Sequence, residues 1–279
     1  VTLVSSSTID DDDDTGTAIT TTGTLTLTSG AAIGSSNTQG LDIDVATLAI
    51  TATGSGNVIV THAGSTNTNL NFGDTIVGGT LTATNTLNDI IDTGTLTITG
   101  ASVFQTTANS KNITLDSSAN AFTGAVTLQA GAGGASAFTT ATIVDSGAIR
   151  INSSAAAAGD LFINATGGNL SVKATSGGIT QAAALTVTGT ATFETDTSSD
   201  VVLSDTGNDF QGAVSITAAN NVTLVDAGAL ILGASTTNGT FAATATSAGD
   251  ITNTGALNIN GAATFTAANN QSITVANAG

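Results

Sequence analysis

The densest group of ionisable side chains in this sequence is a run of five consecutive aspartates, Asp10, Asp11, Asp12, Asp13 and Asp14. Oxygen-rich clusters of this kind can bind Ca²⁺, and the mutual repulsion of neighbouring carboxylates favours a cation. The glycine-rich nonapeptide repeats of calcium-binding solenoids do not occur, however, and a solvated acidic loop is the simpler interpretation. Ca²⁺ binding by this run therefore remains one hypothesis, and we expect no other cofactor.

Few other residues could do catalytic chemistry. His62 is the only histidine, and Glu194 is the only glutamate, followed by Asp196, Asp200 and Asp205. A catalytic triad or a histidine-based zinc site needs partners for His62, and the chain has no cysteine to assist. A glycoside hydrolase needs converging carboxylates, and sugar sites favour the Trp and Tyr that this chain lacks. We therefore predict a non-enzyme without catalytic residues, with His62 in a structural or surface role.

The charge balance excludes several partners. Twenty acidic residues stand against three basic ones, Lys111, Arg150 and Lys173, and give a formal net charge of −17. Binding to nucleic acid or to an anionic membrane surface requires clustered Lys and Arg. The sequence also lacks an apolar run of the roughly 20 residues that a membrane-spanning helix needs. We expect neither nucleic-acid binding nor membrane insertion by this segment.

The hydrophobic pattern of the sequence predicts that short β-strands position these groups. Hydrophobic and polar residues alternate strictly at 24–28 and 95–99, with the sequences Thr-Leu-Thr-Leu-Thr and Thr-Leu-Thr-Ile-Thr. This period of two, with β-branched residues, is typical of half-buried strands. Gly, Asn, Asp and Ser separate the strands and suit tight corners, and proline, which would interrupt a backbone ladder, is absent. The pattern predicts an all-β fold.

Internal repetition indicates how the strands are arranged. The block Leu96-Thr-Ile-Thr-Gly-Ala-Ser-Val-Phe returns in related form at Leu185 and Leu257, with a fainter copy at Leu25. The interval from Leu96 to Leu185 is longer than the intervals on either side of it, and the excess is about one coil. A solenoid tolerates insertion of a whole coil, because each coil contacts only its neighbours. We predict one continuous β-solenoid over residues 1–279, with coils of roughly 18–20 residues, excised from a longer array.

The repeated strings resemble a known family. They include Gly94-Thr-Leu-Thr-Ile-Thr-Gly, Asn208-Asp-Phe-Gln-Gly-Ala-Val-Ser-Ile and Asn221-Val-Thr-Leu-Val-Asp-Ala-Gly-Ala-Leu. These are similar to the repeat regions of filamentous haemagglutinin-like exoproteins, which are large bacterial proteins secreted by the two-partner route. The resemblance covers nearly the whole chain from about residue 22 onward. It implies a right-handed parallel β-helix in an extracellular or cell-surface location, and it transfers no catalytic residue.

These observations favour a structural function. We expect a non-catalytic component of an extracellular bacterial fibre, surface filament or adhesin stalk, which associates with itself head-to-tail or laterally. An alternative is an adhesin module that binds a receptor or glycan on a host or neighbouring cell, although Trp and Tyr are absent and Arg nearly so. The Thr-Xaa-Thr strings leave ice binding as a further alternative, beside a Ca²⁺-dependent solenoid.

Overall fold

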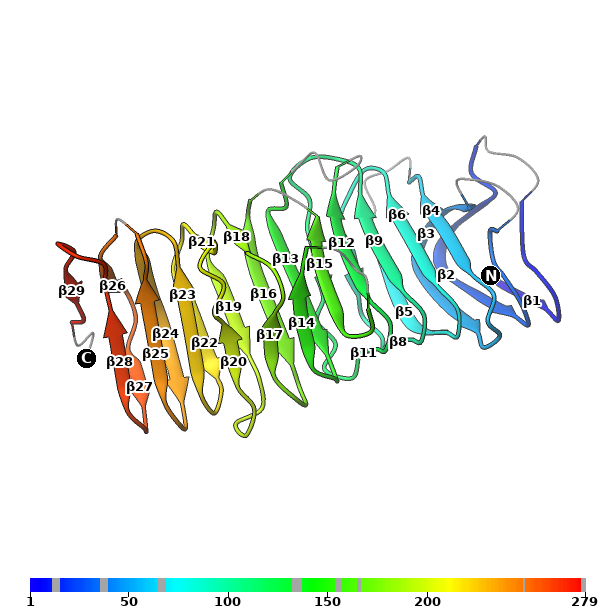
Figure 1. Cartoon of the computed structure of the whole chain (residues 1–279). Helices are drawn as coiled ribbons and strands as arrows, with labels where there is room; N and C mark the ends of the chain where they lie inside the picture. The colour runs from blue at the N-terminus through cyan, green and yellow to red at the C-terminus, as the bar shows by residue number, and fades with distance from the viewer. Residues whose placement is uncertain are drawn as a thin grey trace. The chain divides into compact units, whose positions relative to one another are not determined.

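A computed structural model of the chain describes residues 1–11, 16–35, 40–64, 69–131, 137–153, 157–164, 167–247 and 249–276. The described residues form strands and turns, and none of them lies in a helix that could span a membrane. Contacts divide the chain into two compact units. Residues 1–144 and 154–165 form the first unit, and residues 145–153 and 166–279 form the second. Each unit is a series of turns of short strands (Figure 1).

Within its described residues the first unit contains a set of strands of very unequal length. They are β1 (Thr2–Ser5), β2 (Ile19–Ser29), β3 (Leu41–Ala52), β4 (Val58–His62), β5 (Leu70–Val77), β6 (Leu81–Asn85), β7 (Ile90–Asp92), β8 (Leu96–Ile98), β9 (Ser102–Thr106), β10 (Ile113–Leu115), β11 (Ala121–Phe122), β12 (Val126–Ala130), β13 (Thr140–Asp145) and β15 (Asp160–Asn164).

Strands of the first unit pair in parallel with strands of the following coil. Residues that pair from one coil to the next form a column along the solenoid. In one column Val58 lies beside Leu81, Leu81 beside Ser102, and Ser102 beside Val126. Each of these steps along the column corresponds to one coil of similar length. In the next step Val126 lies beside Leu161, and this step is clearly longer.

The second unit repeats this arrangement. Its described strands are β14 (Ile149–Asn152), β16 (Asn169–Ala174), β17 (Ile179–Gln181), β18 (Thr186–Val187), β19 (Ala191–Glu194), β20 (Val201–Leu203), β21 (Asp209–Phe210), β22 (Val214–Ala218), β23 (Val222–Asp226), β24 (Leu230–Thr237), β25 (Phe241–Ala245), β26 (Ile251–Asn253), β27 (Leu257–Ile259), β28 (Ala263–Thr266) and β29 (Ile273–Thr274).

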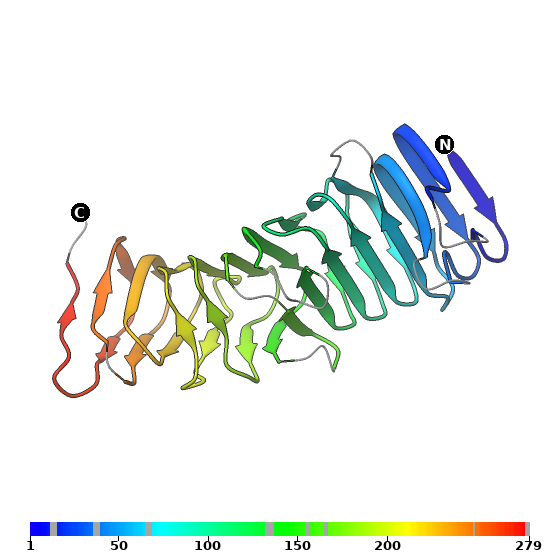
Figure 2. The ribbon, with the colours of Figure 1, turned by 90° about the horizontal axis from the view of Figure 1, so that it is seen from above.

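One column of the second unit shows how its coils vary in length. Leu170 lies beside Ala191, Ala191 beside Val214, and Val214 beside Leu232, and the last of these steps is the shortest. Successive turns of parallel strands are also visible from above (Figure 2). The predicted all-β parallel solenoid is thus confirmed. The last step agrees with the coil length expected from the sequence, whereas the two steps before it are somewhat longer than expected.

Alternating side chains of each strand fill the interior. The inward positions are mostly Val, Ile and Leu, and phenylalanines contact one another between coils. Phe72, Phe104 and Phe122 form a series of edge-to-face pairs with ring centroids 5.9 and 6.1 Å apart. Phe193 and Phe210 repeat the arrangement in the second unit at 6.3 Å. Such pairs contribute about 0.5–1.5 kcal/mol beyond the burial of their surface.

Stacked glycines form the corner after the Leu-Thr-Ile-Thr strand. The Gly100 amide donates to the Gly79 carbonyl in the preceding coil at 3.0 Å, and Gly189 donates to Gly168 at the same distance. A side chain at Gly100 would clash with the Gly79 carbonyl, and one at Gly189 would meet the Gly168 carbonyl at 2.7 Å. The glycine of the repeated block is required because two backbones approach closely there.

Each unit contains a place where one long strand pairs with two short ones. The strand β5 pairs through its first half with β7 and through its second half with β8, and β24 does the same with β26 and β27. In both long strands the register with the preceding coil shifts at a glycine, which is followed two positions later by a buried hydroxyl. Thr75 Oγ1 donates to the Gly73 carbonyl at 3.0 Å, and Ser235 Oγ donates to the Gly233 carbonyl at 3.2 Å.

Candidate functional site

The aspartate run that suggested Ca²⁺ lies only partly within the described residues. Asp12, Asp13 and Asp14 fall outside them. Asp10 is exposed, and the Oδ2 atom of Asp11 accepts the backbone N–H of Asp42 in β3 at 3.2 Å. In the part of the chain that the structure describes, no three His, Asp or Glu side chains are grouped so that they could hold a metal. Ca²⁺ binding by the complete run stays a prediction.

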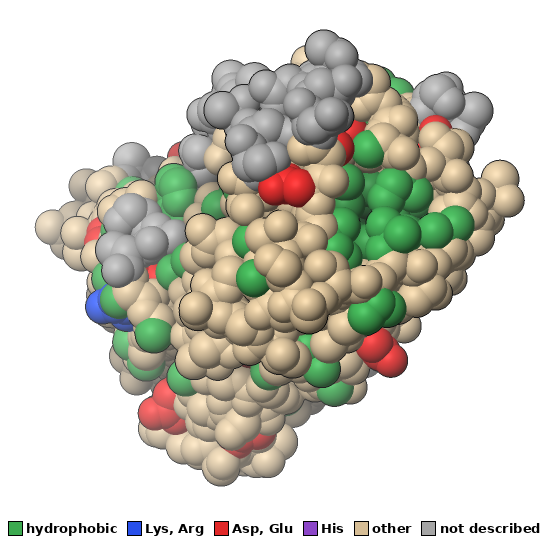
Figure 3. Space-filling view, turned by 90° about the vertical axis from the view of Figure 1, so that its right-hand side faces the viewer, with side chains coloured by type: hydrophobic (Ala, Val, Ile, Leu, Met, Phe, Trp, Pro, Cys, Tyr) green, Lys and Arg blue, Asp and Glu red, His purple; other side chains and the backbone are tan. Residues whose placement is uncertain are grey.

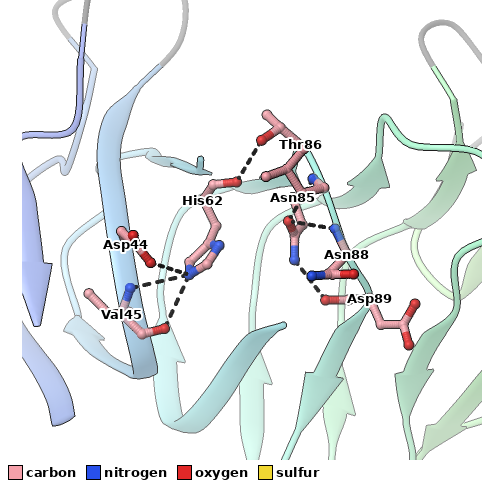
Figure 4. A network of polar contacts seen from close by, with 8 residues as sticks. Asp44, Val45, His62, Asn85, Thr86, Asn88 and Asp89 are labelled. Atoms are coloured by element: carbon pink, nitrogen blue, oxygen red, sulfur yellow. Dashed lines mark hydrogen bonds and ion pairs between the residues drawn. The ribbon is translucent and has the colours of Figure 1, made fainter. Parts of the chain in front are cut away.

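His62 lies at the end of β4 and is fully buried (Figure 4). Its Nε2 atom is 3.2 Å from the Val45 backbone nitrogen, 3.1 Å from the Val45 carbonyl oxygen and 4.0 Å from Asp44 Oδ1. Burial lowers the pKa of the ring below its ordinary value, while the Val45 hydrogen bond and the Asp44 charge oppose this shift. The ring has no accessible surface, and its Nε2 contacts are all with β3.

Glu194 and Asp196 are each bound by neighbouring side chains. Glu194 Oε1 lies 2.6 Å from Lys173 Nζ, and its Oε2 accepts the hydroxyl of Thr217 at 2.7 Å. Partial burial works to raise the pKa of Glu194, but the bonds to Lys173 and Thr217 outweigh it and lower the pKa. The Asp196 carboxyl accepts hydrogen bonds from Ser198 and Ser199 of its own turn and from the Gly177 N–H, and these bonds hold its pKa far below the usual range. Both carboxyl groups are held in the ionised form and are hydrogen-bonded to neighbouring side chains.

Asp200 and Asp205, the other two acidic residues of this segment, also stabilise backbone. Asp200 Oδ1 accepts the backbone N–H of Asn221 in the next coil at 2.9 Å. Asp205 Oδ1 accepts the N–H of Gly207 at 2.8 Å and so closes its own turn. The acidic side chains near Glu194 thus accept hydrogen bonds from backbone of their own turn or of the next coil.

Contacts between a side chain and the next coil recur along the chain. An Asp or Asn oxygen accepts the backbone N–H of a residue one coil later, at 2.7 to 2.9 Å. The pairs are Asp89 with Asn112, Asn169 with Thr190, Asp200 with Asn221, and Asp250 with Ser272. Each such bond satisfies a corner N–H and joins two successive coils.

A buried amide forms the centre of one corner in the first unit. Asn120 Oδ1 accepts the N–H of Leu96 at 2.8 Å, and its Nδ2 donates to Asp92 Oδ2 at 2.6 Å. The other oxygen of Asp92 accepts the N–H of Asp116 at 2.9 Å. Burial raises the pKa of Asp92, and the hydrogen bonds from Asn120, Asp116 and Ser117 oppose that rise. We call this group the Asp92 corner.

The second unit has the same corner with an amide in place of the carboxyl. Asn208 Oδ1 accepts the N–H of Leu185 at 2.9 Å, and its Nδ2 donates to Gln181 Oε1 at 3.0 Å. Gln181 Nε2 returns a bond to Asn208 Oδ1 at 2.7 Å, and Gln181 Oε1 also accepts the N–H of Asp205 at 3.0 Å. Asn208 is fully buried, as Asn120 is. We call this group the Gln181 corner.

The role of Asn120 and Asn208 was not predicted from the sequence. Asn120 and Asn208 each begin a copy of the block Asn-Xaa-Phe-Xaa-Gly-Ala-Val, and each accepts the N–H of the leucine that begins the other repeated block. The sequence does contain a signal for this contact. In both copies of the repeat, the asparagine follows the leucine at nearly the same separation along the chain. That distance is one coil, and it places the two residues side by side.

Ice binding would need an uninterrupted array of threonines on one outward face, and the column that contains Thr28 does not form one. Thr28, Thr51, Ile76, Thr97 and Ala121 lie beside one another in register, so an exposed isoleucine and an alanine interrupt the threonines. Among the described residues drawn in Figure 3, acidic side chains lie at separate places on the face shown. This column gives ice binding no support.

Comparisons with known proteins identify the repeats. The model of a family described as "Repeats of unknown function (DUF5649)" matches residues 55–129, 139–217 and 219–279. Three consecutive matches agree with the internal repetition of the sequence. A search of curated proteins and a search of solved structures found no match.

Proposed function

The chain belongs to the family of DUF5649 repeats of unknown function, and we propose that it is a non-catalytic structural segment of an extracellular bacterial fibre, surface filament or adhesin stalk. The use of its polar side chains carries this proposal. Glu194, Asp196, Asp200 and Asp205 could have served catalysis, and each instead holds a turn or a neighbouring coil. This use of the acidic side chains in holding turns and coils supports a structural role.

Backbone pairing gives the second support. In a parallel solenoid each coil forms its ladder hydrogen bonds with the adjacent coils. Separating two coils therefore requires several bonds to break together, and in this chain the Asp and Asn contacts between coils add to them. Such cohesion suits a segment that has to resist extension and proteolysis outside a cell.

The resemblance of the repeats to filamentous haemagglutinin-like exoproteins supports the proposed location and parent protein. The absence of cysteine is compatible with export in an unfolded state, because no disulfide can form before translocation. The proposal includes association of such segments with one another, head-to-tail or laterally, within filaments. The acidic surface charge favours solubility of the individual segments.

Immunogold electron microscopy on cells that produce the native parent protein tests the proposal. Antibodies against this chain should label surface fibres on intact cells, and deletion of the segment from the parent gene should shorten or remove the fibres. Cells lacking the whole gene are the control for labelling. Gold found only inside permeabilised cells would overturn the proposed location. Labelling of the surface without fibres, together with glycan-array binding by the chain, would favour an adhesin module instead.

A further inference from the structure

His62 belongs to a column of buried polar residues inside the first unit. It lies in register with Asn85 of β6, which in turn lies in register with Thr106 of β9. All three side chains face the interior and have no exposed surface. The equivalent strands of three successive coils, β4, β6 and β9, therefore each end with an inward polar side chain. One of these side chains, His62, can take up a proton near neutral pH.

The neutral amide at this position is well satisfied. Asn85 Nδ2 donates to the Asp89 carbonyl at 2.8 Å, and its Oδ1 accepts the N–H groups of Leu87 at 3.1 Å and Asn88 at 3.2 Å (Figure 4). Asparagine thus uses both ends of its side chain to close the turn that follows β6. Asn85, which is equivalent to His62 in the next coil, therefore shows that a non-ionisable side chain can form hydrogen bonds with both its oxygen and its nitrogen at this position.

The histidine is satisfied on one side only. Its Nε2 atom faces both the N–H and the carbonyl of Val45, and a neutral ring can bond to one of them at a time. Its Nδ1 atom is buried and has no hydrogen-bond partner among the described residues. Protonation would give the ring a second N–H, and one of the two would have no acceptor among those residues.

The charged groups around the ring compensate only in part. On β3, the Asp44 carboxylate lies 4.0 Å from Nε2, and Asp42 is buried beside Thr61, one register position from the ring. On β6 the facing residue is the neutral Asn85. After β6, the Asp89 carboxylate is bound to the backbone and side chain of Asn112, at 2.8 and 3.1 Å. Burial outweighs these charges and lowers the pKa of His62.

We propose that His62 is an acid-sensitive lock of the first unit, whose protonation loosens the pairing of β3, β4 and β6. The unfolded chain takes up a proton at an ordinary histidine pKa of about 6.5, whereas the folded chain resists it. The contribution of His62 to stability is therefore complete above about pH 6.5 and is lost as the pH falls toward the lower pKa of the folded state. This inference does not depend on the proposed fibre role.

Hydrogen–deuterium exchange of the full chain tests the proposal. After correction for the intrinsic effect of pH, amides of β3, β4 and β6 should exchange up to about tenfold faster for each pH unit below 6.5, until the folded pKa is reached. Peptides from β19 and β20 in the second unit are the internal reference. The matched variant is His62→Asn, which copies Asn85 from the next coil and should abolish the response.

Two results would overturn the lock. One is exchange in β3, β4 and β6 that does not accelerate between about pH 7.5 and 5.5 beyond the intrinsic effect. The other is an unchanged response in His62→Asn, which would assign the effect to carboxyls. If the variant does not fold, NMR of the wild-type chain decides, because its single histidine gives an unambiguous signal. A pKa below about 6.5 for that signal supports the proposal, and an ordinary or raised pKa contradicts it.

Discussion

The Asp92 corner and the Gln181 corner solve one structural problem with different chemistry. Both residues lie four positions before the leucine of the repeated block, and both accept a backbone N–H from the next coil. Asp92 accepts this N–H with a carboxyl group, and burial raises the pKa of that group. Gln181 instead accepts it with an amide group that forms two reciprocal hydrogen bonds with the buried Asn208. This position therefore requires a side-chain oxygen that can accept the backbone N–H of the next coil, and that oxygen need not be charged.

A third copy supports this conclusion. Asn253 lies four positions before Leu257, accepts the N–H of Ala276 at 2.9 Å and donates to the carbonyl of Gly255 at 2.9 Å. Asp, Gln and Asn thus occupy equivalent positions and hold the following coil in the same way. Because a neutral amide replaces the carboxyl in two copies, the contact that Asp92 makes with the following coil does not depend on its charge.

Removing the buried asparagines should have the largest effect on stability. Asn208→Ala leaves the Leu185 N–H without its acceptor and removes one of the two hydrogen-bond partners at each end of the Gln181 amide. Asn120→Ala likewise leaves the Leu96 N–H without its acceptor and removes one of the donors to Asp92. The unsatisfied leucine N–H costs about 1–3 kcal/mol and each further lost hydrogen bond costs about 0.5–1.5 kcal/mol, so each variant should lose about 2–4 kcal/mol. Urea unfolding followed by circular dichroism measures the loss.

The matched control for these variants is Asn238→Ala. Asn238 is exposed and donates to the Thr197 carbonyl at 3.2 Å. Its replacement should change the free energy of unfolding by less than about 0.5 kcal/mol. Equal losses from Asn238 and Asn208 would show that burial at the corner does not set the cost, and the comparison between corners would fail.

Glycine replacements at the stacked corner should have the next largest effect. Gly100→Ala and Gly189→Ala place a Cβ against the carbonyl of a glycine in the preceding coil, and such overpacking costs about 1–3 kcal/mol. Gly228→Ala is the control, because an added Cβ meets nothing within 4 Å there. Thermal unfolding should show destabilisation by the first two variants and little change or a small gain for Gly228→Ala. Destabilisation by all three alike would contradict the close approach of the backbones.

The two corners should differ in their response to pH. The pKa of Asp92 is raised from its ordinary value of 3.8, so the folded chain binds this proton more tightly than the unfolded chain does. The Asp92 contribution to stability is largest below about pH 4 and decreases as pH rises through the raised pKa. Asp92→Asn, which copies Asn253, should remove this dependence and keep the corner.

The measurement is the unfolding free energy of wild type minus that of Asp92→Asn, at several values from about pH 4 to pH 7. The difference should fall as the pH rises. The reciprocal variant Gln181→Glu should introduce a pH dependence of the same sign at the second corner. A difference that is flat with pH would mean that Asp92 is solvated in the folded chain, against its burial.

The exposed ion pair should contribute least. Lys173 and Glu194 are about one-third exposed, and pairs of this kind contribute less than about 1 kcal/mol. A double-mutant cycle with Lys173→Ala and Glu194→Gln should give a coupling energy in that range, and added salt should reduce it. A coupling as large as the Asn208→Ala loss would contradict the view that buried amides, rather than surface charges, hold the coils together.

The architecture was easier to predict from the sequence than the polar interior. Strict alternation identifies which side chains of a strand point inward, and repeated blocks identify equivalent coils, so the parallel solenoid could be inferred. The buried positions of Asn120 and Asn208 were not predicted, and the sequence left both a structural and a surface role open for His62, because a polar side chain is buried here only when the neighbouring coil offers a partner. Leu96 supplies that partner to Asn120 from one coil away. The partner is set by coil length, which the sequence pattern predicts only approximately.

The most direct test of the account is the amide exchange of Leu96 and Leu185, measured by NMR in the wild type, Asn120→Ala and Asn208→Ala. If buried asparagines join the coils, both amides are as protected in the wild type as the ladder amides beside them. Each variant should then lose protection at its own leucine while the other leucine keeps it. Rapid exchange of both amides in the wild type, or unchanged protection in the variants, would contradict the claim that these polar side chains hold the solenoid together.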